Sequence, residues 1–333
     1  MENRTSIFTF TFNERHINCL LPVGDFKMKV MVFGGTGWVG HSIARIFSED
    51  GAHVTVCSRG KNAGFVANLP KVIRILRADK NNEAEMRQVL VEPYDVIIDS
   101  VPSEAAIDLV VAHAKKLKQY IHCSSTGGYA PLPCIPGDET LAYSDFMGGW
   151  KQKGIVDSKI MDLFHRKGFP ATVIRPSYIT GPGRLPLDNI GGRRGDFIPD
   201  VLAGKPLDLP NDGQALLHPV HVEGLARAFF LAAHEPRSIG EIYNICLDKA
   251  VTIKRYIEIT AGAFGRKANI ALLPLEAMLK KYEGVCSPIG LSFFATHMCY
   301  DISKARRDLG YKPPMSTEEA IEETAIWAMQ KQH

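Results

Sequence analysis

Residues 29–40 read Lys-Val-Met-Val-Phe-Gly-Gly-Thr-Gly-Trp-Val-Gly, and the fold expected for the whole chain follows from this stretch. Residues 30–33 form a short apolar run with the length and β-branched character of a buried parallel strand. Gly34, Gly37 and Gly40 follow at three-residue spacing, and an amphipathic helical pattern comes next. Strand, glycine turn and helix in this order are typical of a dinucleotide-binding site, since phosphates bind at such a helix N-terminus. The simpler alternative is a glycine-rich turn before an ordinary helix.

Length and composition restrict the class of protein. The chain has 333 residues, enough for one large α/β domain or for a large domain with a smaller lobe. With 45% hydrophobic and 23% charged residues and a formal net charge of +3, it has a globular composition and no general basicity that would indicate nucleic acid or membranes. The seven cysteines show no CxxC pair and no zinc-like spacing, so we expect reduced thiols, no metal site and a cytoplasmic protein. No apolar run approaches the length of a membrane span.

The first 27 residues differ from the rest of the chain. Residues 1–27 lack the apolar core of a signal peptide, and their phenylalanines alternate with threonines as in an edge strand. Met28 stands immediately before the first strand, where chains of this architecture often begin. We therefore expect residues 1–27 to be a disordered extension or a start-site artefact outside the catalytic fold.

The turn after the second predicted strand, residues 53–57, indicates which dinucleotide binds. An acidic residue at the end of this strand binds the ribose 2′-hydroxyl of NAD, whereas an arginine accommodates the 2′-phosphate of NADP. Here the strand ends in Ser58-Arg59-Gly60-Lys61, which has two cations and no acid. The sequence therefore favours NADP over NAD, the alternative being a solvated basic turn.

Further apolar runs alternate with helical patterns along the chain. The later strands are predicted at residues 72–76, 95–99, 120–123, 171–174 and 242–245. This rhythm implies an α/β fold with a Rossmann-type, doubly wound parallel sheet and ligands at the carboxyl ends of its strands. We predict a nucleotide domain from residues 28–180 plus 218–247, and a smaller, mixed substrate lobe from residues 181–217 plus 248–330. The part of the chain after the last predicted strand is expected to be mostly helical.

Several short segments occur in a characteristic order. They are Gly34-Gly35-Thr36-Gly37-Trp38-Val39-Gly40, Ser124-Ser125 with Tyr129, Arg175-Pro176, Gly181-Pro182, Tyr243-Asn244-Ile245 and the Asp-Ile-Ser-Lys segment that begins at Asp301. Together they resemble the extended short-chain dehydrogenase/reductase family, the group of nucleotide-sugar epimerases and dehydratases. The resemblance extends from about Met28 to Met329.

The resemblance implies a set of cofactor contacts. These are Gly34, Thr36, Gly37, Trp38 and Val39 at the pyrophosphate, Ser58 and Arg59 at the 2′-phosphate with Lys61 as a further candidate, Asp79 near adenine, and Ser100, Lys153 and Pro176 near the ribose and nicotinamide. The choice of NADP over NAD as this cofactor comes from the basic turn at Arg59 and Lys61.

Family chemistry uses a serine or threonine, a tyrosine and a lysine. The tyrosinate exchanges a proton with a substrate hydroxyl while hydride moves to or from nicotinamide, and the lysine lowers the pKa of the tyrosine. By resemblance, the catalytic serine is Ser125, with Thr126 as a substitute, and the lysine is Lys153 at the start of a predicted helix. The tyrosine should lie four residues before the lysine, but that position is Gly149. We therefore expect an atypical catalytic site in which Lys153 or a bound water handles the proton.

Three tyrosines are candidates to replace the missing one. Tyr129, Tyr143 and Tyr178 lie in the right part of the chain, but each also fits an ordinary half-buried aromatic residue. A second departure concerns the substrate: the arginine that binds pyrophosphate in nucleotide-sugar enzymes is replaced by Leu217.

Two neighbouring arginines offer a substitute for that charge. Arg193 and Arg194 either supply it or belong to a solvated turn. The sequence thus predicts an NADP(H)-binding oxidoreductase or epimerase/dehydratase-like enzyme. Its substrate would be a small molecule with a hydroxyl or carbonyl group, sugars and nucleotide sugars included.

The loss of the tyrosine also resembles a divergent branch that includes the chloroplast stem-loop RNA-binding proteins. This implies a second hypothesis, a non-catalytic NAD(P)-binding or RNA-binding protein on the same fold. Nucleic-acid binders usually concentrate basic residues on one face, whereas Lys115, Lys116 and Lys118 form the only tight lysine cluster here, at a helix end. We therefore expect no nucleic-acid partner, and the family resemblance is compatible with a homodimer.

Overall fold

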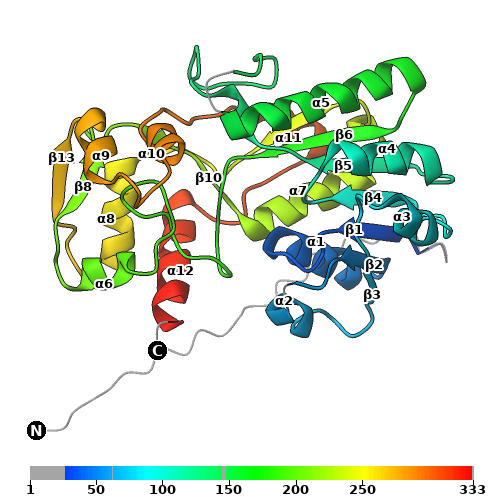
Figure 1. Ribbon diagram of the computed structural model, residues 1–333, viewed down its shortest axis with the longest axis horizontal. Helices are drawn as coiled ribbons and strands as arrows, with labels where there is room; N and C mark the ends of the chain where they lie inside the picture. Colours follow the sequence, from blue (N-terminus) through cyan, green and yellow to red (C-terminus); the bar gives the residue numbers. More distant parts are fainter. Residues whose placement is uncertain (1–26, 62, 145–147, 332–333) are drawn as a thin grey trace, which may run out of the picture.

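The computed structural model describes residues 27–61, 63–144 and 148–331. It has a larger part built around one sheet and a smaller part at the other end of the molecule (Figure 1). The extension predicted for residues 1–27 lies, apart from Lys27, outside the described residues. The predicted domain boundaries remain a prediction.

Seven parallel strands form the central sheet, in the order β11-β6-β5-β4-β1-β2-β3. They are β1 (Lys29–Phe33), β2 (His53–Ser58), β3 (Arg74–Arg77), β4 (Val96–Asp99), β5 (Gln119–Cys123), β6 (Ala171–Pro176) and β11 (Ile242–Ile245). The predicted Rossmann-type parallel sheet is confirmed. The strand order reverses between β1 and β4, and such a reversal leaves a crevice at the carboxyl ends of the two strands. Several strand ends differ from the prediction by one or two residues. At β3 the strand begins at Arg74 rather than at Val72, which is 75% exposed.

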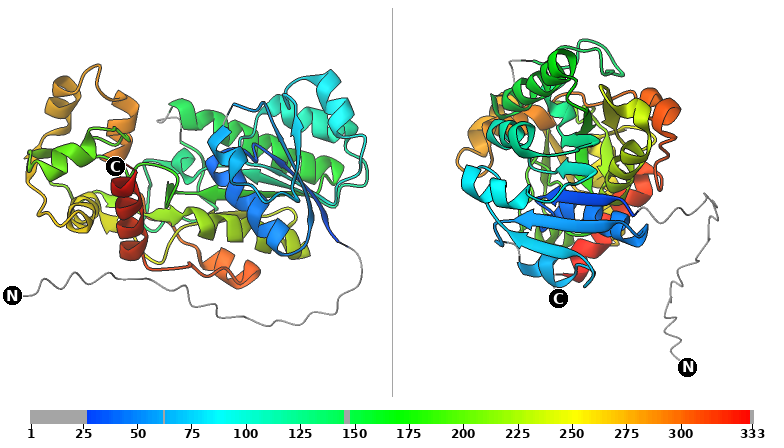
Figure 2. Two further views of the ribbon diagram at one scale, coloured as in Figure 1. Left: turned by 90° about the horizontal axis from the view of Figure 1, so that it is seen from below. Right: turned by 90° about the vertical axis from the view of Figure 1, so that its right-hand side faces the viewer.

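Helices cover both faces of this sheet (Figure 2). One face carries α1 (Trp38–Glu49) and α7 (Val222–His234), and the other carries α3 (Glu83–Val89), α4 (Glu104–His113) and α5 (Gly148–Lys167). Alternate residues of β1 serve the two faces: Val30 and Val32 join the core under α1 and α7, whereas Met31 and Phe33 join the other. Burial on both faces explains why this strand is a continuous apolar run.

The helix that carries Lys153 begins earlier than predicted. Its first residue is Gly148, so Gly149 lies in the first turn of α5 and Lys153 one turn later. Glycine has a low helix propensity, and two of them at the start hid this turn from the sequence pattern.

Side-chain caps fix several helix starts. The Ser103 hydroxyl accepts a hydrogen bond from the Ala106 amide at the start of α4. The last helix, α12 (Thr317–Gln330), begins with a reciprocal capping box between Ser316 and Glu319. In contrast, α1 has Gly37 as its N-cap and no side-chain hydrogen bond there. The first amide groups of α1 therefore lack a side-chain acceptor.

The smaller part combines short sheets with helices. Its strands are β8 (Leu207–Pro210) paired with β13 (Ile270–Leu273), and β9 (Leu216–Leu217) paired with β12 (Val251–Thr252). Its helices are α6 (Phe197–Leu202), α8 (Ile253–Ala263), α9 (Leu275–Lys281) and α10 (Pro288–Phe294), together with α12, which packs on α8. The remaining elements are α2 (Ala63–Ala67), η1 (Thr126–Tyr129), β7 (Tyr178–Thr180) paired with β10 (Pro219–His221), η2 (Pro236–Ser238) and α11 (Ser303–Leu309). The segment after β11, predicted as mostly helical, thus also contributes two strands.

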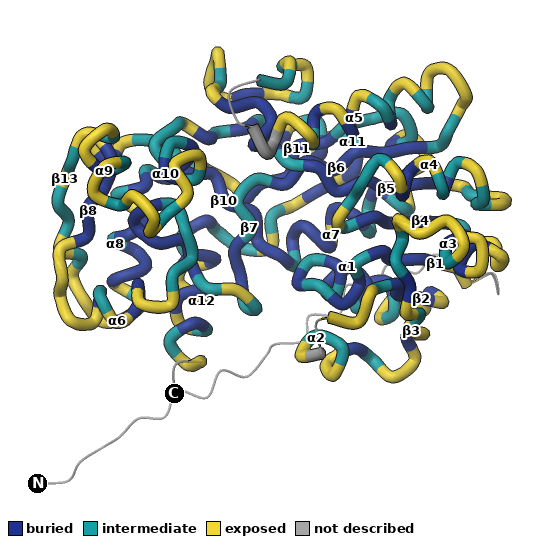
Figure 3. Tube along the Cα trace, viewed as in Figure 1, coloured by how far each residue is buried: buried dark blue, intermediate teal, exposed yellow. Residues whose placement is uncertain are grey.

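Burial follows this architecture. Buried residues run along the central strands and the inner sides of the helices, while exposed residues lie on the outer turns (Figure 3). In the part of the chain that the structure describes, no helix has both the length and the apolar character needed to cross a bilayer. The expected cytoplasmic location and homodimer remain predictions.

Candidate functional site

Two cavities lie at the carboxyl ends of the central strands. The glycine-loop cavity, of about 330 Å³, is lined by residues that follow β1, β2, β3 and β4. The Lys153 cavity, of about 360 Å³, is lined by the start of α1, the ends of β4, β5 and β6, one turn of α5, and the smaller part. Of the residues predicted from the sequence, the first cavity contains Gly34, Thr36, Gly37, Ser58, Arg59, Lys61 and Asp79. The second contains Trp38, Val39, Ser100, Ser125, Thr126, Lys153 and Pro176. Their roles as cofactor contacts and catalytic groups remain predictions.

The glycines of the turn serve different purposes. A Cβ on Gly34, whose φ is +75°, would lie 2.6 Å from the Ser100 hydroxyl. A Cβ on Gly40 would lie 2.3 Å from the Gly34 carbonyl oxygen, so packing of the protein itself demands both glycines. At Gly37 the φ of −94° suits any residue, and a Cβ would meet only the Gly34 oxygen at 3.3 Å. The fold has little need of glycine at this position. A phosphate bound at the start of α1 would require glycine there, because a side chain would block its approach.

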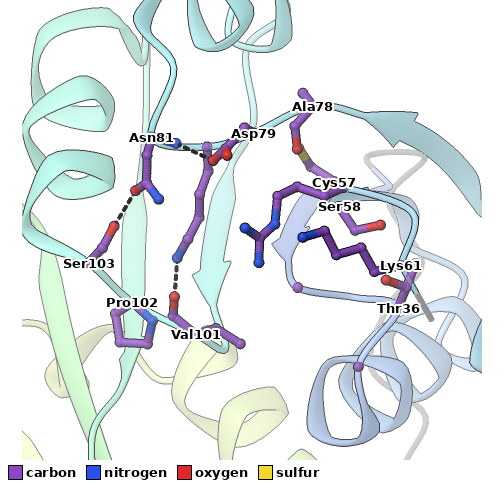
Figure 4. A pocket seen from close by; sticks show the side chains of 14 residues that line it. Thr36, Cys57, Ser58, Lys61, Ala78, Asp79, Asn81, Val101, Pro102 and Ser103 are labelled. Carbon is purple, nitrogen blue, oxygen red and sulfur yellow. Dashed lines mark hydrogen bonds between the residues drawn. The ribbon is translucent and has the colours of Figure 1, made fainter.

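The turn after β2 brings two cations to the glycine-loop cavity. Arg59 and Lys61 are exposed, and no ion pair joins either to a carboxylate within the described residues. Figure 4 shows the Lys61 side chain directed into the space between the strand ends. The Ser58 hydroxyl accepts a hydrogen bond from the Gly60 amide at 3.2 Å and so closes the turn.

Lys80 is a third cation in this cavity, but its charge is balanced. Its Nζ lies 2.6 and 2.7 Å from the two carboxylate oxygens of Asp99, which is fully buried at the end of β4. The ammonium group also donates to the Val101 carbonyl, which fixes the end of β3 against that of β4. Sequence reasoning missed this pair. The available signal was an aspartate inside a buried strand, which needs a counter-charge.

The Lys153 cavity lacks the tyrosine of the family pattern. Gly149 lies one helical turn before Lys153 and has no side chain to offer. Arg175 donates to the Tyr129 hydroxyl, the Tyr143 hydroxyl donates to Asp157, and the two rings stack with centroids 5.7 Å apart. Burial raises the pKa of both phenols well above the ordinary value. Neither of these tyrosines lines the cavity, so they are structural.

Tyr178, the third candidate, does line the Lys153 cavity. Its ring packs against Phe293 with centroids 5.6 Å apart, and its hydroxyl has no hydrogen-bond partner among the described residues. Burial raises the pKa of Tyr178, and the positive charge of Arg193 acts in the opposite direction.

Behind this cavity lies a buried cluster centred on Asp157 of α5. The Ser124 hydroxyl donates to Asp157 Oδ2 at 2.7 Å, and Arg175 Nε does so at 3.0 Å. His122 Nε2 lies 2.9 Å from Asp157 Oδ1, within ion-pair distance but outside hydrogen-bond geometry. Burial opposes ionisation of the aspartate, yet His122 and Arg175 hold its pKa below the usual value. The cluster fixes Ser124, which lines the cavity, to α5. Sequence reasoning missed the cluster, although an arginine inside a buried strand requires an acid.

The two adjacent arginines of the loop before α6 have separate roles. Arg194 Nε lies 3.1 Å from Asp188 Oδ2, and its guanidinium also reaches Asp196, so it holds the loop together. Arg193 lines the Lys153 cavity. Leu217, at the position of the family's arginine, is fully buried in β9. Of the two alternatives left by the sequence, a charge in the site fits Arg193 and a structural turn fits Arg194.

Known proteins share this sequence pattern and fold. A model of the NAD dependent epimerase/dehydratase family matches residues 30–109 and 105–246. The chloroplast stem-loop binding protein of 41 kDa b from Arabidopsis thaliana is 27% identical over 311 residues, which span 89% of this chain and 78% of that protein. The 2′-dehydrokanamycin reductase of Streptomyces kanamyceticus is 24% identical over 272 residues, or 81% of this chain and 76% of the reductase.

Solved structures agree on the fold. The UDP-glucuronic acid 4-epimerase of Bacillus cereus in complex with NAD superposes with a TM-score of 0.73 at 19% identity, over 92% of this chain and all of the epimerase. The UDP-glucose 4-epimerase of Thermotoga maritima gives a TM-score of 0.74 at 18% identity, over 92% of this chain and 100% of that enzyme. The resemblance inferred from the sequence, including the branch of the stem-loop binding proteins, is confirmed. With the family model matching well over half of its length, this chain belongs to the NAD dependent epimerase/dehydratase family.

Proposed function

We propose that the protein binds NADP(H) across the two cavities. In this role it acts on a hydroxyl or carbonyl group of a small molecule, as an oxidoreductase or an epimerase/dehydratase-like enzyme. The observation that carries the proposal is the pair of cations at the end of β2, Arg59 and Lys61, neither of which forms an ion pair within the described residues. An NAD-specific site would have a carboxylate at this point, because the ribose 2′-hydroxyl needs an acceptor.

The residues present fit a dinucleotide. The uncapped start of α1 suits the pyrophosphate, as does Gly37, where a Cβ would meet only the Gly34 carbonyl oxygen. The turn at Arg59 suits a 2′-phosphate. A bound nicotinamide supplies a hydride donor or acceptor. Lys153, the one lysine in the described lining of its cavity, would bind the nicotinamide ribose and hold or move a proton at Nζ. Ser125 would orient the substrate hydroxyl.

The choice between the two dinucleotides is tested by calorimetric titration of the full chain with NADPH and NADH. We expect tighter binding of NADPH, and Arg59→Ala should weaken it by about 10- to 100-fold, because a hydrogen bond to a charged group contributes about 1.5–3 kcal/mol. The same change should leave NADH binding nearly unaltered. Lys71→Ala, which removes a charge from an exposed turn outside the cavity, is the matched control. Equal or tighter binding of NADH to the unmodified protein would contradict the NADP assignment.

Turnover is tested separately. Protein and NADPH are incubated with a panel of carbonyl compounds while absorbance reports oxidation of the cofactor. We expect turnover with at least one member of the panel. Binding of NADPH without turnover, on this panel and on the reverse panel of hydroxyl compounds with NADP⁺, would count against an enzyme.

A second function is a non-catalytic NAD(P)-binding or RNA-binding protein on this fold. Two observations favour it: Gly149 at the position of the tyrosine, and 27% identity to a protein named as a stem-loop binding protein. Retention of a stem-loop RNA on the immobilised protein, measured across a salt series, tests it. Steeply salt-dependent retention together with absent turnover would favour this function over the first.

A further inference from the structure

The Lys153 cavity has an unbalanced positive charge. Its described lining includes Lys153, Arg184 and Arg193, and it contains no aspartate or glutamate. None of the three cations forms an ion pair with a carboxylate elsewhere in the described residues. Lys153 and Arg193 are partly buried, and because an unpaired charge that is partly desolvated is costly, the arrangement calls for an anionic ligand.

Arg193 is the most firmly held of these cations. One of its terminal nitrogens donates to the Leu185 carbonyl and the other donates to the Ile179 carbonyl at 2.6 Å. A guanidinium has five N–H donors, so three remain for a ligand. Burial lowers the pKa of Arg193, and the like charge of Arg184 adds to this effect. Two guanidinium groups close enough to repel each other would both be relieved by an anion between them.

The loop that carries Arg193 is rigidly built. Asp188, fully buried, accepts hydrogen bonds from the Ile190 amide at 2.9 Å and from the Gly192 amide at 2.8 Å. It also pairs with Arg194, which follows directly after Arg193. The guanidinium of Arg193 is thus oriented before a ligand arrives, and little conformational entropy is lost on binding.

Trp38 joins both arginines to the start of α1. The guanidinium carbons of Arg184 and Arg193 lie 5.7 and 5.9 Å from the centre of its indole ring. The indole Nε1 donates to the Pro182 carbonyl at 2.6 Å. At Gly183, where φ is +112°, a Cβ would lie 2.5 Å from the indole. This close contact brings the 182–184 segment, and with it Arg184, over the indole at the edge of the cavity.

We infer that the substrate is a compact anion, a hydroxy or oxo compound whose phosphate or carboxylate group binds between Arg193 and Arg184. This inference rests on the proposed function, in which the cavity also receives the nicotinamide. A volume of about 360 Å³ shared with that ring leaves room for a substrate the size of a sugar phosphate or sugar acid. Leu217 in place of the family's arginine removes the usual charge for a nucleotide diphosphate.

The test uses the full chain saturated with NADP⁺, so that the cations at Arg59 and Lys61 are already occupied. Glucose 6-phosphate, gluconate and glucose serve as probes with a phosphate, a carboxylate and no charge, and UDP serves as the nucleotide probe. We expect at least one of the two anionic sugars to bind at least about 10-fold more tightly than glucose, with UDP weaker than that anion. Whichever of the two binds more tightly identifies the anionic group.

Variants assign the anion to the two arginines. Arg193→Gln should weaken binding of the preferred anion by about 10-fold or more, and Arg184→Gln by several-fold, without changing the affinity for glucose. Arg255→Gln, which removes a charge from the exposed side of α8, should change neither. Arg184 is exposed and forms no hydrogen bond within the described residues, so its variant decides the test if Arg193→Gln does not fold.

Three results would overturn the inference. One is equal affinity for the charged and uncharged sugars, and another is undiminished anion binding in the folded arginine variants. The third is UDP binding at least about 10-fold more tightly than both anionic sugars, which would indicate that the site binds a nucleotide diphosphate. The NADPH titration described above tests the proposed function, so its result distinguishes a failure of that function from a failure of the anion inference. If no dinucleotide binds, the same probes are titrated into the Arg59→Ala protein without cofactor, and anion binding there would support this inference alone.

Discussion

The glycine-loop cavity and the Lys153 cavity share one edge of the same sheet but are assembled differently. The lining of the first comes from the ends of β1, β2, β3 and β4 and the residues that follow them, and one of its cations, Lys80, has a carboxylate partner in Asp99. The second combines strand ends with α1, α5 and the loop before α6, and its arginines have no acid to balance them.

The difference distinguishes residues that the fold requires from residues that are expected to contact the substrate. The strand ends of the glycine-loop cavity are tied to the sheet, and the glycine spacing after β1 matches the family's pattern. The Lys153 cavity is lined in part by side chains of the smaller part, Arg193 among them. In that part Leu217 stands where the family has an arginine. Gly149 is a further departure, in α5. The departures at Gly149 and Leu217 therefore concern groups that contact substrate in the family's pattern.

The largest expected effect concerns the Lys153 cavity. Lys153→Met should lower turnover of any substrate found by about 100- to 10,000-fold, the range for loss of a general acid or base, and leave the melting temperature unchanged. Lys159→Met on the same helix, where the lysine forms a surface ion pair with Asp108, is the control. Unchanged turnover in Lys153→Met would remove the lysine from the catalytic assignment.

The next effect is the acid sensitivity of a buried histidine, His218, between β9 and β10. His218 is buried, accepts a hydrogen bond from the Tyr300 amide at Nδ1 and contacts the Leu247 carbonyl through Nε2. Burial lowers the pKa of His218 to about 4, against about 6.5 in an unfolded chain. Protonation therefore favours the unfolded state. The contribution is complete above about pH 6.5 and is lost as the pH falls towards 4, amounting to about 3 kcal/mol.

Urea unfolding at pH 7, 5 and 4 measures this loss. In His218→Asn the decrease in unfolding free energy between pH 7 and 4 should be smaller by about that amount. Identical pH dependence in the two proteins would show that acid acts elsewhere.

The smallest effect distinguishes two glycines of the glycine-loop cavity. Gly37→Ala should weaken NADPH binding by about 10- to 100-fold with little change in stability, because the added methyl group enters space meant for phosphate. Gly40→Ala should do the reverse and destabilise the fold by about 1–3 kcal/mol, since its Cβ collides with backbone. Calorimetry and thermal melting of both variants provide the measurement. Full NADPH affinity in Gly37→Ala would place the pyrophosphate elsewhere.

Features encoded by neighbouring residues were accessible from the sequence. The run from Val30 to Phe33, the glycine spacing and the basic turn at Arg59 are local patterns, and each strand they predicted lies in the sheet. The absence of a side chain at Gly149 was equally plain. Some errors lay at element ends, as at Val72 and Gly148, where exposure and glycine weaken the periodic signal. Others concerned the two short strands after β11, which a mostly helical prediction did not include.

The sequence by itself determined the parallel sheet, the nucleotide turn and the missing tyrosine, because each depends on residues close together in the chain. Only the tertiary structure decided that Arg193 lines the cavity while Arg194 is tied to Asp188, and that Tyr178 rather than Tyr143 faces the site. These outcomes depend on contacts such as the hydrogen bond from Trp38 to the Pro182 carbonyl, across 144 positions of sequence. No local pattern encodes which of two adjacent side chains meets a cavity that is closed by such distant segments.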